Sequence, residues 1–278
     1  RGQVLKFKIK GSKVHVKMKY KNKEAGIKNV ILSYRSKVET IDYPFEYKVT
    51  RSGDHYIIDA QIDMSVLSLE ELFWDVFAVT EKNGEEVRVS AYWSRWQRLK
   101  LLLMNYQCDV DKEHIIFPYS TITCKMAFTY RTRSKYDGFD VKIKELVAFG
   151  VYTLLLPYWK KKRVWLVFEK FCSMAQDNGY YFFKYCMEQL PKEKKQHIYY
   201  ILDTDSADYD KMKQYGKHVI PFMSFRHILY SLVANLYIAS DSKKHLYTWR
   251  AKPNVISNRI SKHNILSLQH GVTALKRV

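Results

Sequence analysis

The residues best suited to chemistry stand near the end of the sequence, where a histidine is followed at once by a glycine. Residues 265–268 are predicted to form a strand, and His270 comes two positions after it. Imidazole is well matched to proton transfer near neutral pH, so His270 could take a proton from a hydroxyl group. Gly271 allows close approach to the backbone, whose N–H groups, together with Lys276, could hold phosphate oxygens. The pair alone does not establish catalysis, so a catalytic role has to be supported by the neighbouring sequence.

The elements that would position these residues follow from the pattern after residue 163, where strands and helices alternate. Strands are predicted at residues 164–168, 197–202, 219–221, 236–239 and 265–268, and helices at residues 179–190, 208–215 and 225–234. This alternation with short connections is typical of a doubly wound parallel sheet, predicted over residues 164–278. Ligands of such sheets bind beyond the carboxyl ends of the strands, which makes Glu169, Asn178, Gly179 and Ser240 further candidates.

The first half of the chain has a different period. Residues 4–10 and 14–20 alternate apolar and mostly basic side chains, and Gly11-Ser12 between them predicts a hairpin turn. About seven or eight such short strands predict an antiparallel β-sandwich of immunoglobulin-like architecture over residues 1–135. Its histidines, His15, His55 and His114, are isolated in the sequence, and no chemistry is predicted in this half.

Residues 136–163 are predicted to connect the two halves through an apolar helix over residues 141–158. Four cations follow it, Lys160, Lys161, Lys162 and Arg163. The longest apolar run here has about 13 residues, too few for the roughly 20 that cross a bilayer. Such a helix followed by cations could lie on an anionic membrane surface. The alternative is a linker helix packed on a neighbouring domain and followed by a solvated charge run.

The amino-acid composition indicates which classes of binding partner to expect. Lys and Arg number 47 against 28 Asp and Glu, a formal net charge of +19, so a polyanion is expected: nucleic acid, anionic lipid or a phosphate-bearing polymer. The four cysteines have neither metal-knuckle nor CxxC spacing, which fits a reducing cytoplasm. The aspartates between residues 203 and 210 lack the glycine and final glutamate of a calcium loop, so no metal site is predicted.

The surroundings of the His-Gly pair resemble a known family. Residues 268–276 read LQHGVTALK, which resembles the histidine-glycine motif of the CDP-glycerol glycerophosphotransferases, the family that builds teichoic acids and related capsule polymers. Residues 164–185 resemble the entry of that family into its first nucleotide-fold domain. Gly216-Lys217, Ser224 and Ala239-Ser240 also fall where the family has similar residues. The resemblance covers residues 164–278.

The resemblance implies a two-lobed glycosyltransferase-B fold, of which this chain would carry the lobe that faces the acceptor. It implies that a hydroxyl of a growing, lipid-linked polyol-phosphate polymer attacks the β-phosphate of CDP-glycerol or CDP-ribitol and releases CMP, without a cofactor. His270 would be the base and Lys276 would steady phosphate charge. Gly271 and Thr273 belong to the same motif, while Asn178, Gly179 and Ser240 would line the cleft. The implied location is the cytoplasm, peripheral on the inner face of the cell membrane.

The chain departs from the family at its end, and other functions remain open. Only eight residues follow His270, and the donor-binding segments of the family have no counterpart, so these 278 residues alone are expected to be inactive. A basic module that binds nucleic acid or an anionic polymer without turnover is the alternative. Against nucleic acid, the basic residues are interleaved along strands, and neither a zinc knuckle nor an RNP-like aromatic motif is present.

Overall fold

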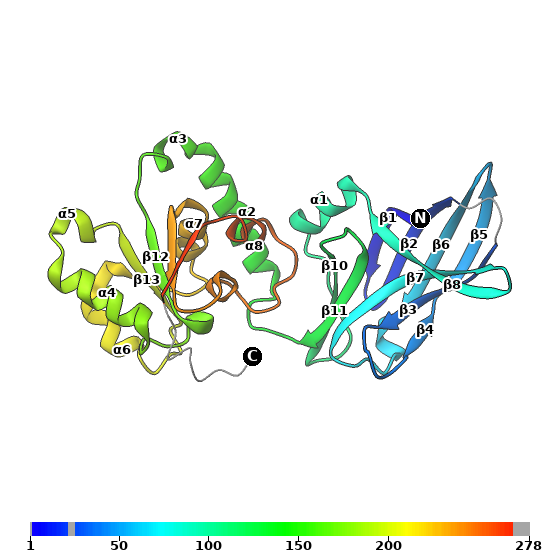
Figure 1. Cartoon of the computed structure of the whole chain (residues 1–278), viewed down its shortest axis with the longest axis horizontal. Helices are drawn as coiled ribbons and strands as arrows, with labels where there is room; N and C mark the ends of the chain where they lie inside the picture. Colours follow the sequence, from blue (N-terminus) through cyan, green and yellow to red (C-terminus); the bar gives the residue numbers. More distant parts are fainter. Residues whose placement is uncertain (1, 22–25, 269–278) are drawn as a thin grey trace. The chain divides into compact units, whose positions relative to one another are not determined.

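The protein is described from a computed structural model, which describes residues 2–21 and 26–268. The chain divides into two compact units between Lys135 and Tyr136. Figure 1 shows the strand-rich first unit in blue to green and the mixed second unit in green to red. Each unit is described by itself.

The first unit consists mainly of β-strands. They are β1 (Gly2–Lys10), β2 (Lys13–Lys21), β3 (Ile27–Tyr34), β4 (Asp42–Pro44), β5 (Glu46–Ser52), β6 (His55–Asp63), β7 (Leu72–Lys82), β8 (Glu85–Trp93), β9 (Cys108–Asp109), β10 (His114–Ser120) and β11 (Met126–Thr132). A 3₁₀ turn, η1 (Met64–Val66), and the helix α1 (Arg95–Leu103) interrupt them. The predicted hairpin joins β1 to β2, and Gly11 takes the positive φ of 59° that its turn requires.

The strands form one 11-stranded, mixed sheet in the order β5-β6-β2-β1-β8-β7-β11-β10-β9, with β3 and β4 joined to it through β7. β1 pairs with β8 in parallel, through Gly2 with Ala91 and Val4 with Trp93. The other pairings are antiparallel, as between β1 and β2. The sheet is therefore not purely antiparallel as predicted, and the immunoglobulin-like sandwich is not confirmed. Alternation identifies the buried face of a strand, whereas the choice of a partner far away in the sequence depends on the whole fold.

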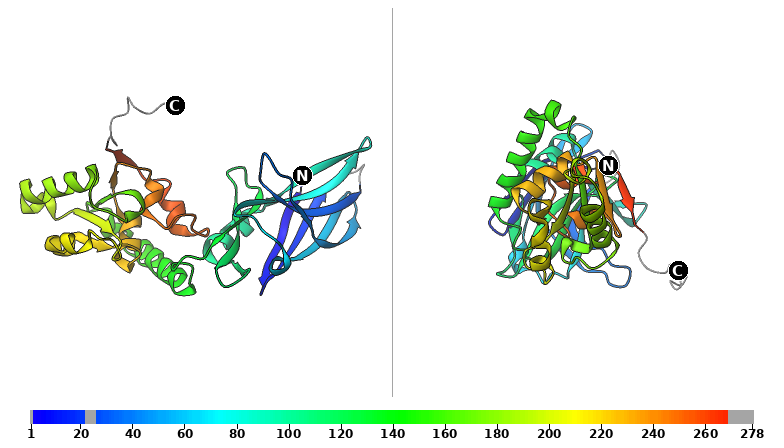
Figure 2. Two further views of the ribbon diagram at one scale, coloured as in Figure 1. Left: turned by 90° about the horizontal axis from the view of Figure 1, so that it is seen from below. Right: turned by 90° about the vertical axis from the view of Figure 1, so that its left-hand side faces the viewer.

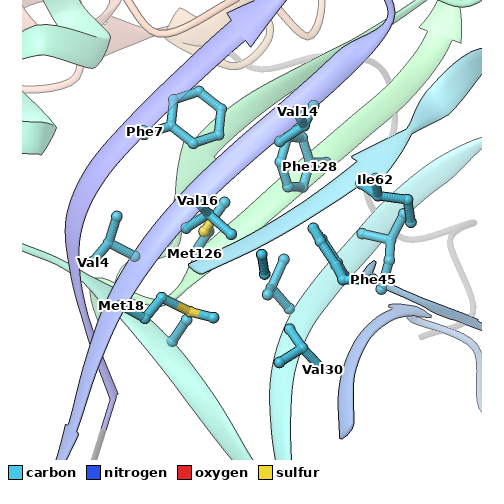
Figure 3. Packing of buried hydrophobic residues seen from close by; sticks show 14 of the residues in the cluster. Val4, Phe7, Val14, Val16, Met18, Val30, Phe45, Ile62, Met126 and Phe128 are labelled. Atoms are coloured by element: carbon cyan, nitrogen blue, oxygen red, sulfur yellow. The ribbon is translucent and has the colours of Figure 1, made fainter. Parts of the chain in front are cut away.

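One apolar cluster fills the interior of the first unit. Figure 3 shows Val4 and Phe7 of β1 and Val14, Val16 and Met18 of β2 within it, all with at most 4% of their surface exposed. Val30, Phe45, Ile62, Met126 and Phe128 are the further members labelled in that view. Because side chains alternate along a strand, the lysines between the buried residues of β1 and β2 lie on the opposite, solvent-facing side of these strands.

The second unit alternates helices and strands. It contains α2 (Phe139–Leu154), α3 (Leu156–Trp159), β12 (Trp165–Phe168), η2 (Lys170–Cys172), α4 (Asn178–Gln189), α5 (Lys192–Lys195), β13 (Ile198–Leu202), α6 (Tyr209–Met212), η3 (Lys213–His218), β14 (Val219–Pro221), α7 (Phe225–Val233), β15 (Leu236–Ala239), η4 (Lys243–Leu246), α8 (Val255–Ile260) and β16 (Ile265–Ser267). The helix predicted over residues 208–215 is therefore a short α-helix followed by a 3₁₀ segment.

The five strands of this unit form a parallel sheet in the order β14-β13-β12-β15-β16. Helices lie on both sides of it (Figure 1, Figure 2). Leu166 and Phe168 of β12 belong to the apolar cluster that includes α2, α7 and α8, whereas Val167 belongs to the cluster that includes Phe183 of α4. A strand buried on both faces accounts for the continuous apolar run in its sequence. The predicted parallel α/β architecture is thus confirmed.

The segment predicted as a single linker helix consists of α2 and α3, which meet at Leu155. Pro157 explains the break, because a proline has no N–H to continue the helical hydrogen bonds. Val141 and Ala148 of α2 belong to the apolar cluster of the second unit, so α2 is part of its core. Glu145 of α2 is also buried, and its Oε1 accepts a hydrogen bond of 2.6 Å from the hydroxyl of Tyr247.

Candidate functional site

The carboxyl edge of the parallel sheet contains the point where the chain changes direction. From β12 the chain passes through α4 to β13 on one side, and it later returns through α7 to β15 on the other side of β12. Neighbouring strands whose connections leave in opposite directions open a crevice at their carboxyl ends, where α/β proteins bind ligands. Glu169 follows β12 and Ser240 follows β15, so both lie at this crevice.

Glu169 has a defined structural task. It is 1% exposed, and its Oε1 accepts hydrogen bonds from the N–H groups of Asp177 (2.8 Å) and Tyr180 (2.9 Å). Its Oε2 accepts a third from the N–H of Gln176 (3.1 Å). The first N–H groups of a helix lack partners within the helix and attract an anion. The carboxylate of Glu169 therefore occupies the N-terminus of α4, where a phosphate would otherwise be expected to bind.

Asn178 and Gly179, two of the predicted cleft residues, open helix α4. Asn178 is exposed, and its N–H donates to the Asp177 carboxylate (2.7 Å). Gly179 is buried, and a Cβ atom added to it would lie 3.2 Å from both the Phe168 carbonyl oxygen and Glu169 Cγ. The glycine thus allows α4 to approach β12 closely. This packing accounts for Gly179 without a contact to a substrate.

Ser240 and His245 bring polar atoms without partners to the crevice. Among the described residues, neither the buried Oγ of Ser240 nor the buried Nδ1 of His245 has a hydrogen-bond partner. The other ring nitrogen of His245 lies 3.5 Å from Asp241 Oδ1. Burial lowers the pKa of His245; Asp241 opposes this shift, and Lys170 adds to it. A buried polar atom without a partner is costly, so these two atoms are suited to contact a ligand.

Two aromatic rings flank His245. Phe171 meets it edge to face at 4.4 Å between ring centroids, and Trp249 stacks on it at 5.8 Å. Trp249 remains 51% exposed. Phe171 and Cys172 have φ angles of 57° and 52°, a left-handed conformation that is strained for residues other than glycine and is common near functional sites. The exposed part of these rings could stack against the flat or apolar face of a ligand.

The predicted residues of the His-Gly motif, His270, Gly271, Thr273 and Lys276, lie outside the described residues. The described chain leads up to them beside Ser240. Leu268 donates its N–H to the carbonyl oxygen of Ala239 (2.8 Å), the residue before Ser240. The last described residue of the chain is therefore at the crevice.

Comparison with known proteins supplies a relative. No family model matches the chain. Over 135 residues the chain is 34% identical to the minor teichoic acid biosynthesis protein GgaB of Bacillus subtilis, a match that covers 47% of this chain and 14% of GgaB. This chain is related to a teichoic acid biosynthesis protein. The resemblance to proteins of teichoic acid biosynthesis is thereby confirmed for part of the chain, which spans about one seventh of the relative's length.

Two solved structures of TarS from S. aureus also match, each at 14% identity, with a TM-score of 0.38 and over 50% of this chain. The match covers 25% of the TarS chain and 40% of the chain of its fragment 217–571.

Sequence reasoning selected Glu169 and Ser240 from their places after strands, but it missed Phe171, His245 and Trp249. The sequence carries no motif for these three, because their proximity depends on η2 and η4 meeting at the crevice.

The four cations predicted to contact a membrane lie at the opposite edge of the sheet. Arg163 precedes β12, whereas Glu169 follows it, so the cations belong to the amino edge. Lys160 to Arg163 are exposed, as is Leu154, with 82% of its surface. A hollow of about 310 Å³ at this edge is lined by Lys160, Arg259 and Lys262, and Trp159 also lines it. The indole N–H of Trp159 is buried and has no partner among the described residues.

Within residues 2–21 and 26–268, no three His, Cys, Asp or Glu side chains are grouped so that they could hold a metal ion. The helices of the same residues include none with the length and apolarity needed to cross a membrane.

Proposed function

We propose that this chain forms part of a transferase that moves glycerol phosphate, or a related polyol phosphate, from a CDP-linked donor to the hydroxyl end of a teichoic-acid-like or capsule polymer. The observation that carries this proposal is the 34% identity to a teichoic acid biosynthesis protein over 135 residues. The His-Gly motif and the crevice of the parallel sheet support it. CDP-glycerol or CDP-ribitol would be the donor, and no cofactor is needed.

In the proposed reaction, His270 accepts the proton of the attacking hydroxyl group. The hydroxyl oxygen forms a bond to the β-phosphorus of the donor while the bond between that phosphorus and the bridging oxygen breaks, so CMP leaves with the bridging oxygen. Lys276 and the backbone around Gly271 and Thr273 would stabilise the negative charge on the transferred phosphate. In support, the described chain reaches Leu268 beside Ser240, two residues before His270.

The crevice suggests how the acceptor would be held. Glu169 fills the N-terminus of α4, so this helix is not available to an acceptor phosphate. Within residues 2–21 and 26–268, Ser240 Oγ and His245 Nδ1 each lack a hydrogen-bond partner, and both could bond a polyol hydroxyl. The exposed ring of Trp249 could contact the carbon atoms of the polyol, and Asn178 lies exposed at the start of α4. These are the residues proposed to line the acceptor side.

The proposed partners are a lipid-linked polymer and an anionic membrane surface, with the protein cytoplasmic and peripheral on the inner face of the cell membrane. Lys160, Lys161, Lys162 and Arg163 support this, because they are exposed beside the apolar Leu154. Their place at the amino edge would leave the crevice at the other edge open to the polymer end. The alternative function, a basic module that binds anionic polymer or nucleic acid without turnover, draws on the net charge of +19.

The test is CMP release from CDP-glycerol with a polyol-phosphate acceptor. The longest natural form of the protein should turn over, and His270→Ala should lower the rate by about a hundredfold or more, the usual contribution of a general base. His55→Ala, which removes a histidine of the first unit, should leave the rate unchanged. The 278 residues alone should release no CMP.

Two results would contradict the proposal. Absence of turnover by the folded longest form, with both CDP-glycerol and CDP-ribitol, would favour the module without turnover. Full activity of His270→Ala would remove the histidine from its proposed role.

A further inference from the structure

The solvent-facing side of β1, β2, β6 and β5 carries a dense set of lysines. Six of them, Lys6, Lys8, Lys10, Lys17, Lys19 and Lys48, are here called the lysine face. Their common side follows from alternation, since their neighbours Phe7, Val16, Met18 and Ala60 are buried in the cluster of Figure 3 or next to it. The strand pairing then places these lysines side by side across strands.

Their arrangement is unfavourable for the fold itself. Lys6 on β1 stands directly opposite Lys17 on β2, and Lys10 stands opposite Lys13. Like charges in such cross-strand pairs destabilise a sheet. Among the described residues, no carboxylate lies within 4.0 Å of the amino groups of Lys6, Lys8, Lys10 or Lys17, whereas Lys28 in the same unit is paired with Glu81. Asp59 of β6 stands opposite both Lys17 and Lys48, so one carboxylate relieves the charge repulsion only in part among the described residues of this face.

The lysine face is also hollowed. A hollow of about 650 Å³ is lined by Lys6, Lys8, Lys10, Lys17, His15 and Asp59 among others. A second, of about 370 Å³, lies next to it, because it shares His15 and Asp59 and extends to Lys48 on β5. Together the two hollows run across four strands. An open groove of this length is suited to an extended chain more than to a compact ligand.

We propose that the lysine face binds a linear polymer of phosphodiester-linked polyols. Lysines two apart on one strand are separated by roughly 6.8 Å, a distance of the same order as that between successive phosphates joined by a short polyol. The groove would hold the chain while its end reacts elsewhere. The identity of the polymer rests on the proposed function, whereas the binding of a polyanion rests on the lysine face alone.

The other polyanions fit this face less well. Proteins that hold single-stranded nucleic acid stack bases on exposed aromatic rings. The two rings that line the hollows, Tyr106 and Tyr47, are both partly buried against the apolar cluster, and the Tyr47 hydroxyl donates to the Lys28 carbonyl oxygen (2.6 Å). A membrane surface is broad and would contact a protruding rather than a hollowed face, with apolar side chains inserted. A chain of phosphodiester-linked polyols has neither bases to stack nor a broad surface, so a charged groove is sufficient to hold it.

The experiment measures binding of the full chain to a fluorescent poly(glycerol phosphate), without any donor. One variant combines Lys6→Gln, Lys8→Gln, Lys10→Gln and Lys17→Gln. A control with the same change in charge combines Lys37→Gln, Lys82→Gln, Lys100→Gln and Lys112→Gln, which are exposed lysines elsewhere in the first unit. We expect the first variant to bind about tenfold more weakly or worse, and its affinity to depend less on salt than that of the parent chain, because fewer counterions are released. The control should bind nearly as tightly as the parent.

Equal loss in both variants would reduce the effect to net charge and overturn the proposal, as would no loss in either. Stronger binding of a single-stranded oligonucleotide with the same number of phosphates, or of phosphatidylserine vesicles, would assign the face to those partners instead. Circular dichroism would confirm that both variants fold. The binding assay contains no donor, so its result does not depend on turnover. A chain that binds the polymer here but releases no CMP in the separate turnover assay would contradict only the proposed transferase. Turnover with unchanged binding by the Lys6, Lys8, Lys10 and Lys17 variant would contradict only the role of the lysine face.

Discussion

His227 in α7 shows how one buried residue holds a loop of the second unit. It is wholly buried, and its Nδ1 accepts a hydrogen bond of 3.0 Å from the N–H of Met223. Met223 has a φ of 56°, a strained value for a residue with a side chain. Since Nδ1 must stay unprotonated to accept this bond, the folded protein requires a neutral imidazole. Burial lowers the pKa of His227 from 6.5 to about 3, although an interaction with the Leu246 backbone opposes the shift.

This depressed pKa predicts a loss of stability in acid. Between pH 6.5 and about 3 the unfolded chain binds a proton at His227 that the folded chain does not, so the free energy of unfolding falls as the pH falls through that window. The slope should approach about 1.4 kcal/mol per pH unit at most. His227→Gln, which keeps an acceptor but does not titrate, should show a flatter profile. Urea unfolding between pH 4.5 and 7, followed by helical circular dichroism, measures it, and identical slopes would contradict the assignment.

The placement of candidate residues at this scale was only partly predictable. Glu169 and Ser240 were identified because residues after buried parallel strands lie at a ligand-binding edge. The role of Glu169 as the acceptor at the N-terminus of α4 was not predictable. It depends on the path of residues 170–177, which brings the N–H groups at the start of α4 back to the Glu169 carboxylate. His245 was missed for a similar reason: its contacts with Phe171 and Trp249 join segments far apart in the sequence.

At the scale of elements, the contact of α4 with β12 is controlled by a single glycine. Gly179 lies in the first turn of the helix, where the backbone carbonyl of Phe168 is close. Gly150 in α2 offers the opposite case, because a Cβ atom added there would meet nothing within 4 Å. Both glycines are helical, so they differ mainly in the space around them.

Replacement of each glycine by alanine should therefore act in opposite directions. Gly179→Ala should lower the free energy of unfolding by about 1–3 kcal/mol, because the backbone of β12 has to yield to the methyl group. Gly150→Ala should raise it by roughly 0.5–1 kcal/mol, because alanine loses less backbone freedom in a helix. Denaturant unfolding of both variants measures the pair. A neutral or stabilising Gly179→Ala would mean that α4 is free to move away from the sheet.

At the scale of the whole molecule, two groups of exposed cations among the described residues differ in their surroundings. One is the lysine face of the first unit, and the other is the run from Lys160 to Arg163 in the second unit. The two surfaces differ in shape, since the first is a groove and the second stands beside exposed apolar residues such as Leu154. We therefore expect them to bind different polyanions.

Vesicles that contain phosphatidylserine distinguish the two surfaces. Replacing Lys160, Lys161, Lys162 and Arg163 by Gln should weaken binding of the full chain to such vesicles by tenfold or more, since each basic residue near an anionic surface contributes about 1 kcal/mol. The matched control is the Lys6, Lys8, Lys10 and Lys17 variant, which also loses four positive charges. It should bind vesicles nearly as tightly as the parent does. Cosedimentation measures both, and unchanged binding of the first variant would remove the membrane proposal.

The sequence by itself determined which halves of the chain form strands or alternate strands with helices, where the charge is carried and which motif resembles a known family. These properties are local: a period of two or a buried apolar run reflects the burial of each residue, and a motif is a set of neighbours. Only the tertiary structure decided that β1 pairs in parallel with β8, that α2 joins the core of the second unit and that Glu169 caps α4. Each of these depends on contacts between distant residues, and such contacts are selected by the packing of the whole unit, which no local pattern encodes.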